Sequence, residues 1–108
     1  MNNFVAHILV VDDDDGIRSL VKQYLIENNF LVTTADSAEN AEEKILVIKF
    51  DLIILDVMMS GKSGLEFIKN NKSKIDTPII LFWSFFIVLF KIFFILNISS
   101  FGSKGFGK

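Results

Sequence analysis

The chain has 108 residues, a formal net charge of -2 and no cysteine. This length allows one small domain and excludes a second, since domains mostly run from about 50 to 250 residues. The absence of cysteine excludes disulfides and thiolate metal sites, and it fits a reducing compartment. All 13 acidic residues lie between Asp12 and Asp76, whereas residues 79–108 have none and hold eight of the 12 Phe. This shift in composition predicts two parts with a boundary near Leu81.

The first half of the chain predicts two strands with a helix between them. Residues 7–11 are apolar apart from the histidine and end at four aspartates, which indicates a buried strand. Asp14 or Asp15 can cap the following helix, and Asn28-Asn29 can end it. Its predicted apolar face consists of Ile17, Leu20, Val21, Tyr24 and Leu25, with Tyr24 expected in the core. Residues 31–35 then predict the second strand.

Residues 36–82 continue the alternation of helices and strands. It predicts a helix from the capping-box spacing of Asp36 and Glu39, a strand over 50–55, a helix from Ser63 and a strand over 79–82. Strands that alternate with helices favour parallel pairing by right-handed crossovers, with helices on both faces. The sequence therefore predicts a doubly wound α/β fold.

Acidic residues follow two of these strands directly. Asp12 and Asp13 come after the first strand and Asp56 comes at the end of the third, so the three carboxylates should meet at the carboxyl edge of the sheet, where ligands of such folds bind. Like charges at close range need a compensating cation or proton, and Mg²⁺ prefers oxygen ligands. Aspartate can also accept a phosphoryl group as an aspartyl phosphate. Asp56 is the candidate nucleophile, and Asp12 and Asp13 are the candidate metal ligands.

Three segments carry a family resemblance. Residues 8–14 (ILVVDDD), 51–64 (DLIILDVMMSGKSG) and 77–81 (TPIIL) resemble a bacterial two-component receiver domain in both motif and spacing, over about three quarters of the chain. The resemblance implies a flavodoxin-like parallel sheet of strand order 2-1-3-4. It also implies a cytoplasmic phosphorelay signalling domain rather than an enzyme, with a sensor histidine kinase or a phosphotransfer protein as its partner.

The same resemblance assigns roles by position. It implies Asp12 and Asp13 as the acidic pair, Asp56 as the phosphoacceptor, and the backbone carbonyl of Met58 as a further ligand of Mg²⁺. One departure lies in this part: the family usually has proline where Ser60 stands. We expect that change to affect the stiffness of the loop more than its chemistry, because proline only presets the turn.

The resemblance stops after residue 81. Trp83 stands where the family has a Thr or Ser that senses the phosphoryl group, and no Lys-Pro pair follows. We therefore expect a truncated receiver over residues 1–81 that lacks the usual output face. Its sheet would be incomplete and followed by an apolar helix or span.

Residues 82–108 form the Phe-rich tail, and the apolar run over 79–98 is long enough to cross a bilayer, which needs about 20 apolar residues. Residues 79–81 cannot serve both a strand and a span, and this conflict favours a frameshifted segment over an evolved membrane anchor. A membrane-tethered or inert receiver remnant is the alternative interpretation, and it would add membrane association to the cytoplasmic location.

A phosphatase of the haloacid dehalogenase type is a less favoured alternative. Its Asp-x-Asp motif would make Asp12 the nucleophile and Asp14 the acid, but Gly16 stands where that motif has Thr or Val. The sequence also shows no basic element that would bind nucleic acid.

Overall fold

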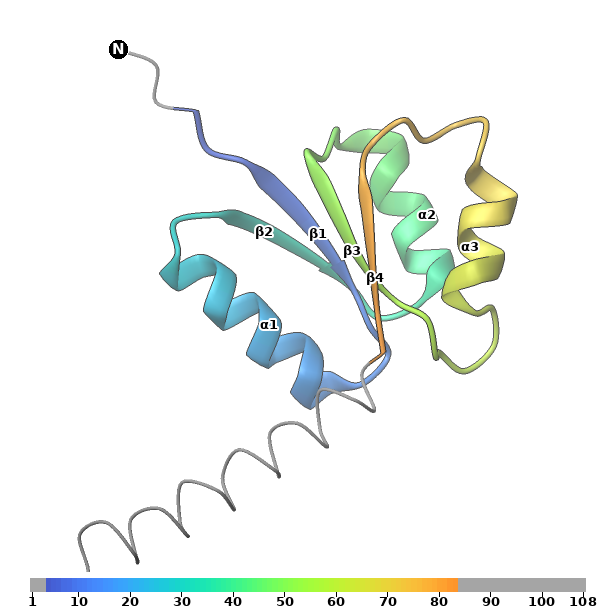
Figure 1. Ribbon diagram of the computed structural model, residues 1–108, viewed down its shortest axis with the longest axis horizontal. Coiled ribbons are helices and arrows are strands. Elements are labelled where there is room, and N and C mark those ends of the chain that lie inside the picture. The colour runs from blue at the N-terminus through green and yellow to red at the C-terminus, as the bar shows by residue number, and fades with distance from the viewer. Residues whose placement is uncertain (1–3, 84–108) are drawn as a thin grey trace, which may run out of the picture.

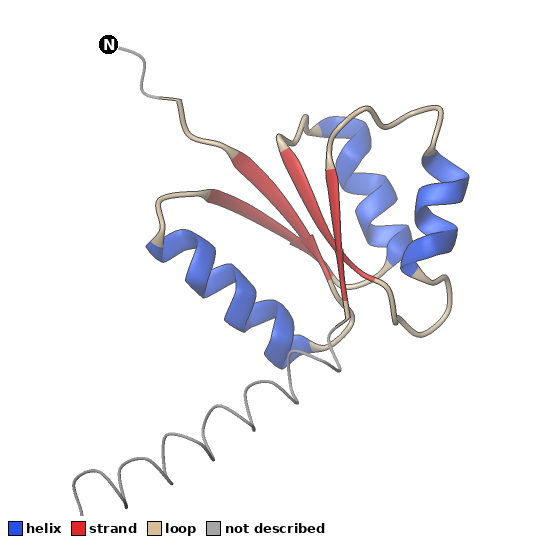
Figure 2. Ribbon diagram, viewed as in Figure 1, coloured by secondary structure: helices blue, strands red, loops and turns tan. Residues whose placement is uncertain are grey.

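The computed structural model describes residues 4–83, which form a parallel sheet with helices on both faces (Figures 1 and 2). The elements are β1 (His7–Val11), α1 (Asp15–Glu27), β2 (Leu31–Ala35), α2 (Ala38–Val47), β3 (Leu52–Asp56), α3 (Gly64–Asn71) and β4 (Ile79–Phe82). The four strands are parallel and lie in the order β2-β1-β3-β4. Helix α1 covers one face, and α2 and α3 cover the other (Figure 1). The predicted doubly wound fold and its strand order are confirmed.

Helix α1 begins and ends where the sequence predicts. The Asp14 side chain accepts a hydrogen bond from the backbone N–H of Ile17 at 2.8 Å, so Asp14 is the N-cap. Asn28 is the C-cap, and Asn29 has a φ of 69°, the left-handed conformation that asparagine tolerates better than most residues. This turn sends the chain back into β2.

The cap of α2 differs by one residue from the prediction. Ser37, not Asp36, is the N-cap, and its hydroxyl accepts from the backbone N–H of Asn40 at 3.0 Å. Asn40 then reaches back, because its side-chain oxygen accepts from the N–H of Asp36 at 3.3 Å. The predicted box at Asp36 is therefore wrong, whereas the predicted cap of α3 is confirmed: the Ser63 hydroxyl accepts from the N–H of Glu66 at 3.2 Å.

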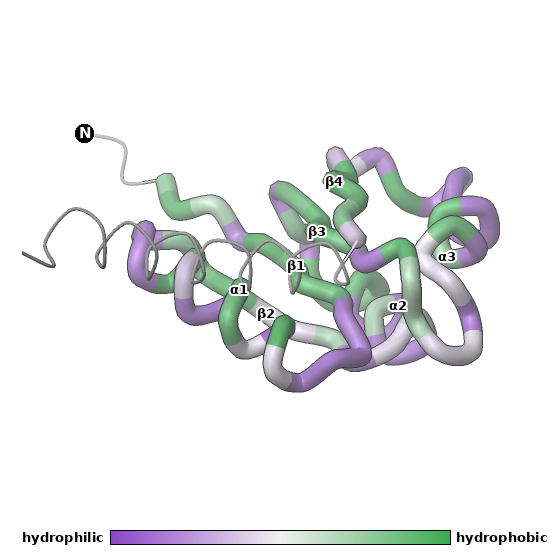
Figure 3. Tube along the Cα trace, turned by 60° about the horizontal axis from the view of Figure 1, so that its bottom comes forward, coloured by the Kyte–Doolittle hydropathy of each residue, from purple (hydrophilic) through white to green (hydrophobic). Residues whose placement is uncertain are grey.

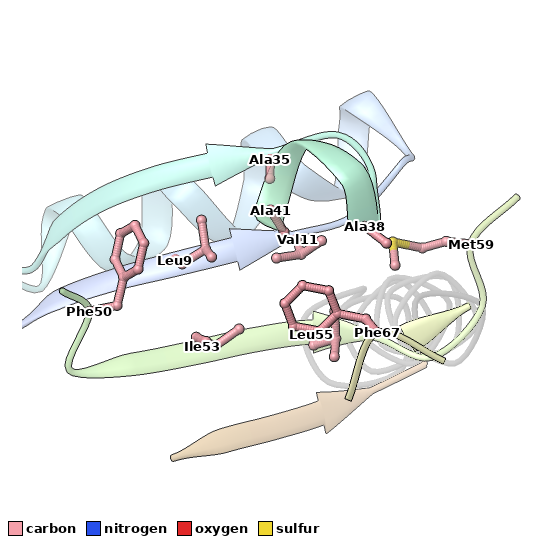
Figure 4. Close-up of a cluster of buried hydrophobic side chains, with 10 residues drawn as sticks. All are labelled: Leu9, Val11, Ala35, Ala38, Ala41, Phe50, Ile53, Leu55, Met59 and Phe67. Carbon is pink, nitrogen blue, oxygen red and sulfur yellow. The ribbon is translucent and has the colours of Figure 1, made fainter. Parts of the chain in front are cut away.

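The main core lies between the sheet and the pair α2 and α3. Strands β1 and β3 are hydrophobic except for His7 at the start of β1 and Asp56 at the end of β3, as strands covered on both faces usually are (Figure 3). Figure 4 shows the buried cluster, which consists of Leu9, Val11, Ala35, Ala38, Ala41, Phe50, Ile53, Leu55, Met59 and Phe67. Phe67 is fully buried, so α3 is held against the sheet directly behind the carboxyl end of β3.

The face of α1 that meets the sheet is narrower than predicted. Ile17 and Leu25 are buried, and Val21 packs against a second, smaller cluster that Leu25 forms with Ile8 and Val10 of β1. Residues 17, 21 and 25 form one stripe at four-residue spacing. Leu20 is exposed and Tyr24 is 64% exposed, so the prediction of Tyr24 as a core residue is wrong. Helix α1 lies beside β2 and β1 (Figure 1).

Strand β4 contains the first part of the long apolar run. It pairs with β3, and Phe82 lies opposite Asp56 in the register. Residues 79–82 are thus part of the sheet, whereas residues 84–98 of the apolar run and the predicted tail helix lie outside the described residues. Within 4–83, none of the helices combines the length and the apolar character that a bilayer crossing requires.

Candidate functional site

Three carboxylates meet at the carboxyl edge of the sheet. Asp12 and Asp13 follow β1, Asp56 is the last residue of β3, and the two strands are hydrogen-bonded neighbours. One oxygen from each side chain lies within 4.8 Å of the others. The structure therefore brings together the three residues that the sequence singled out, and the topology of the sheet is the cause.

Burial strongly affects the charge of one of these groups, Asp12. Asp12 and Asp56 are fully buried, whereas Asp13 is exposed. One oxygen of Asp12 accepts from the backbone N–H of Asp14 at 2.9 Å, but Oδ2 is buried and receives no hydrogen bond from a donor in residues 4–83. Burial, together with the nearby Asp56 and Asp13 carboxylates, raises the pKa of Asp12 from 3.8 to about 7. A proton or a cation at this position would compensate the clustered charge.

The Asp56 side chain is oriented by the loop that follows it. Its Oδ1 accepts from the backbone N–H of Met58 at 3.1 Å, and the N–H of Val57 donates to the carbonyl of Phe82 at 2.9 Å. Gly64 closes the loop, because its N–H donates to the carbonyl of Val57 at 3.2 Å. A Cβ on Gly64 would overlap with the Asp56 carbonyl oxygen and lie 3.1 Å from the Val57 Cα. Only glycine allows this approach.

Two polar contacts at the site were not predicted. Ser60 donates both its backbone N–H, at 2.8 Å, and its hydroxyl, at 2.9 Å, to Oδ2 of Asp13. Arg18 donates to the backbone carbonyl of Asp12 at 2.8 Å and pairs with Asp15 on α1. The sequence offered a signal for Ser60 in its departure from proline, but it gave no indication of the partner.

The two methionines after Asp56 lie differently. Met58 has an exposed side chain, and its backbone carbonyl as a metal ligand stays a prediction. The Met59 side chain is buried in the main cluster (Figure 4), where it anchors the loop to the core.

The fold and the acidic cluster define a class: doubly wound α/β domains with an acidic site at the carboxyl edge of a parallel sheet. Residues 8–87 match the family model of the response regulator receiver domain. The chain belongs to this family, and it is thus the receiver domain of a two-component response regulator.

Similar proteins agree with this assignment. The protein PetR of Rhodobacter capsulatus is 45% identical over 75 residues, which are 69% of this chain and 32% of PetR. The transcriptional regulatory protein ResD of Bacillus subtilis is 42% identical over 74 residues, or 68% of this chain and 31% of ResD. The chain therefore spans about a third of the length of these curated relatives.

Solved structures show the same fold. The response regulator TrrA of Thermotoga maritima, in complex with Mg(2+)-BeF, is 44% identical with a TM-score of 0.67, covering 71% of this chain and 68% of TrrA. The chemotaxis protein CheY4 of Vibrio cholerae is 34% identical with a TM-score of 0.67, covering 72% of this chain and 68% of CheY4.

Proposed function

We propose that the chain accepts a phosphoryl group on Asp56 from a sensor histidine kinase or a phosphotransfer protein, with Mg²⁺ as cofactor. Asp12, Asp13, Asp56 and the backbone carbonyl of Met58 would hold the metal ion. The observation that carries this proposal is the meeting of three carboxylate oxygens within 4.8 Å, two of them on fully buried side chains. The module would act as a signalling domain that receives the group, not as an enzyme that turns over a substrate.

The donor set fits Mg²⁺. The cluster offers only oxygen atoms, which this hard cation prefers, and Oδ2 of Asp12 is a buried acceptor that has no protein donor within 4–83. When bound, the cation would neutralise the carboxylates and the charge that develops on the phosphoryl oxygens. The Mg(2+)-BeF complex of TrrA, a protein 44% identical to this chain, supports the same assignment.

The residues of the chain supply position and a nucleophile. The N–H of Met58 holds one oxygen of Asp56, which fixes the carboxylate relative to the loop. An Asp56 oxygen would form the bond to phosphorus while the P–N bond of the donor phosphohistidine breaks, and the leaving imidazole takes up a proton. Because Asp56 lies at the end of a buried strand, its backbone cannot move far during the transfer.

The residue that follows β4 bears on how this receiver would transmit its signal. Trp83 follows β4 directly and occupies the position where the family resemblance expects a Thr or Ser. Tryptophan has no hydroxyl, and its single donor, the indole Nε1–H, is carried on a bulky ring rather than on Cβ, where Thr and Ser carry theirs. We propose that the chain keeps phosphoryl acceptance at Asp56 and lacks the usual hydroxyl coupling to an output surface.

Intact-mass measurement of the full chain after incubation with acetyl phosphate and MgCl₂ tests the proposal. We expect one added phosphoryl group that is lost in acid and is absent without Mg²⁺ or in Asp56→Asn. Asp76→Asn is the matched control, because this aspartate is exposed and lies before β4, at the opposite edge of the sheet. Absence of phosphorylation in the folded wild-type chain would instead support the inert remnant.

A further inference from the structure

The loop between β3 and α3, residues 57–63, connects the site to the rest of the domain at several points. Met59 is buried in the core, and Gly61 has a φ of 75°, so the chain turns sharply between Ser60 and Lys62. The Lys62 ammonium lies 3.1 Å from a Glu42 oxygen on α2. The loop is thus held against α2 on one side, and on the other side Ser60 donates hydrogen bonds to Asp13 in the β1–α1 turn.

The anchor at Glu42 is itself well supported. The other Glu42 oxygen accepts from the side-chain amide of Asn71 at 2.8 Å, and that amide also donates to the Phe67 carbonyl at 2.8 Å. Asn71 is only 2% exposed, so its orientation is fixed by packing. The bond from Asn71 and the nearby Lys62 lower the pKa of Glu42, so both contacts favour its charged form. Ser60 therefore projects from a loop whose position is set independently of the metal site.

Ser60 places two donors on a single oxygen of Asp13. The N–H distance is 2.8 Å and the hydroxyl distance is 2.9 Å, and both reach Oδ2 across 47 residues of sequence. Asp13 is exposed, so its side chain would otherwise exchange between rotamers. A carboxylate has about four acceptor positions, so Oδ1 and the remaining position on Oδ2 stay available to a cation.

We propose that Ser60 is a positioning residue that fixes the Asp13 carboxylate for Mg²⁺. This inference rests on the proposed magnesium site, and it names Ser60 as a residue that helps to set how tightly the site binds Mg²⁺. A proline, which the family usually has here, possesses neither the N–H nor the hydroxyl. The two hydrogen bonds to Asp13 therefore depend on the serine of this chain. Hydrogen-bond partners of metal-binding carboxylates raise affinity by holding the ligand in its binding orientation.

The test is the affinity of the full chain for Mg²⁺, measured as the increase in the free energy of urea unfolding with MgCl₂ concentration. Unfolding is followed by the fluorescence of Trp83, the single tryptophan of the chain. For Ser60→Ala we expect Mg²⁺ to bind about three- to tenfold more weakly, which is at or below the roughly 10-fold minimum typical of losing such a partner, because the backbone N–H remains. Ser60→Thr keeps a hydroxyl and should restore the affinity.

Ser63→Ala is the matched control in the same loop. It removes the hydroxyl that caps α3, so it should lower stability without Mg²⁺ and leave the Mg²⁺ affinity unchanged. Equal or tighter Mg²⁺ binding by Ser60→Ala than by wild type would overturn the positioning role while leaving the site itself intact. Failure of the wild-type chain to respond to Mg²⁺ would refute the magnesium site, and with it this inference.

Discussion

Replacement of Asp12 by asparagine should stabilise the metal-free chain. The substitution keeps an oxygen that can accept from the N–H of Asp14, and it removes the charge of a fully buried carboxylate. The pKa of Asp12 rises from 3.8 to about 7, mainly because of burial and then because of Asp56. Since each pKa unit corresponds to about 1.4 kcal/mol, the ionised Asp12 destabilises the fold by about 4 kcal/mol. The buried amide offsets part of this gain, so we expect about 2 kcal/mol.

The effect has a defined pH window. Between pH 3.8 and about 7 the folded chain keeps a proton on Asp12 that the unfolded chain has lost, so the stability of the wild type falls as pH rises. Below 3.8 both states are protonated and the contribution vanishes. Above about 7 both states are ionised and the full penalty remains. The stability advantage of Asp12→Asn over wild type should therefore be largest above pH 7, and it should reverse near pH 4, where the charge penalty is gone and the cost of the buried amide remains.

Urea unfolding in EDTA at pH 8 and at pH 4 measures this difference. In a second series at pH 8, MgCl₂ should stabilise the wild type and should stabilise Asp12→Asn much less, because the variant has lost a metal ligand. If Asp12→Asn is no more stable than wild type at pH 8 without metal, the reasoning from burial and charge repulsion is wrong.

Three further substitutions test the surroundings of the site. Gly64→Ala should lower the free energy of unfolding by about 2–3 kcal/mol and slow phosphorylation of Asp56, because the new Cβ overlaps with the Asp56 backbone. A variant that is as stable as wild type in urea would contradict this expectation. Phe67→Ala should cost about 3–5 kcal/mol in the same assay, since the ring is fully buried, and a loss below about 1 kcal/mol would be inconsistent with the core described. Glu42→Gln should cost about 1 kcal/mol at pH 7, and this loss should shrink as pH falls through the lowered pKa of Glu42, which a pH series of urea midpoints would detect. A loss that is independent of pH would show that the charge of Glu42 is not what matters.

The sequence predicted the elements well because their signals are local. The apolar runs of β1 and β3, the cap at Asp14 and the turn at Asn28-Asn29 need no knowledge of the rest of the molecule. The meeting of Asp12 with Asp56 also followed, because parallel strands end at the same edge.

The remaining features depend on where elements lie in space. Tyr24 has the periodicity of a core residue, yet only the position of α1 over β1 and β2 decides which stripe is buried. The bond from Ser60 to Asp13 joins residues 47 positions apart, and the need for glycine at 64 arises from the path of the loop beside Asp56. The tail beyond residue 83 lies outside the described structure, so its frameshift and anchor interpretations stay predictions.

The central claim is that Asp56, among the clustered carboxylates, receives the phosphoryl group. Borohydride reduces an aspartyl phosphate to homoserine, so treatment of the full chain after reaction with acetyl phosphate and Mg²⁺, followed by peptide mass spectrometry, locates the acceptor directly. We predict homoserine at position 56 and at none of the other aspartates. Homoserine at position 12, as the phosphatase alternative requires, or at none of the aspartates of a folded chain that binds Mg²⁺, would contradict the account.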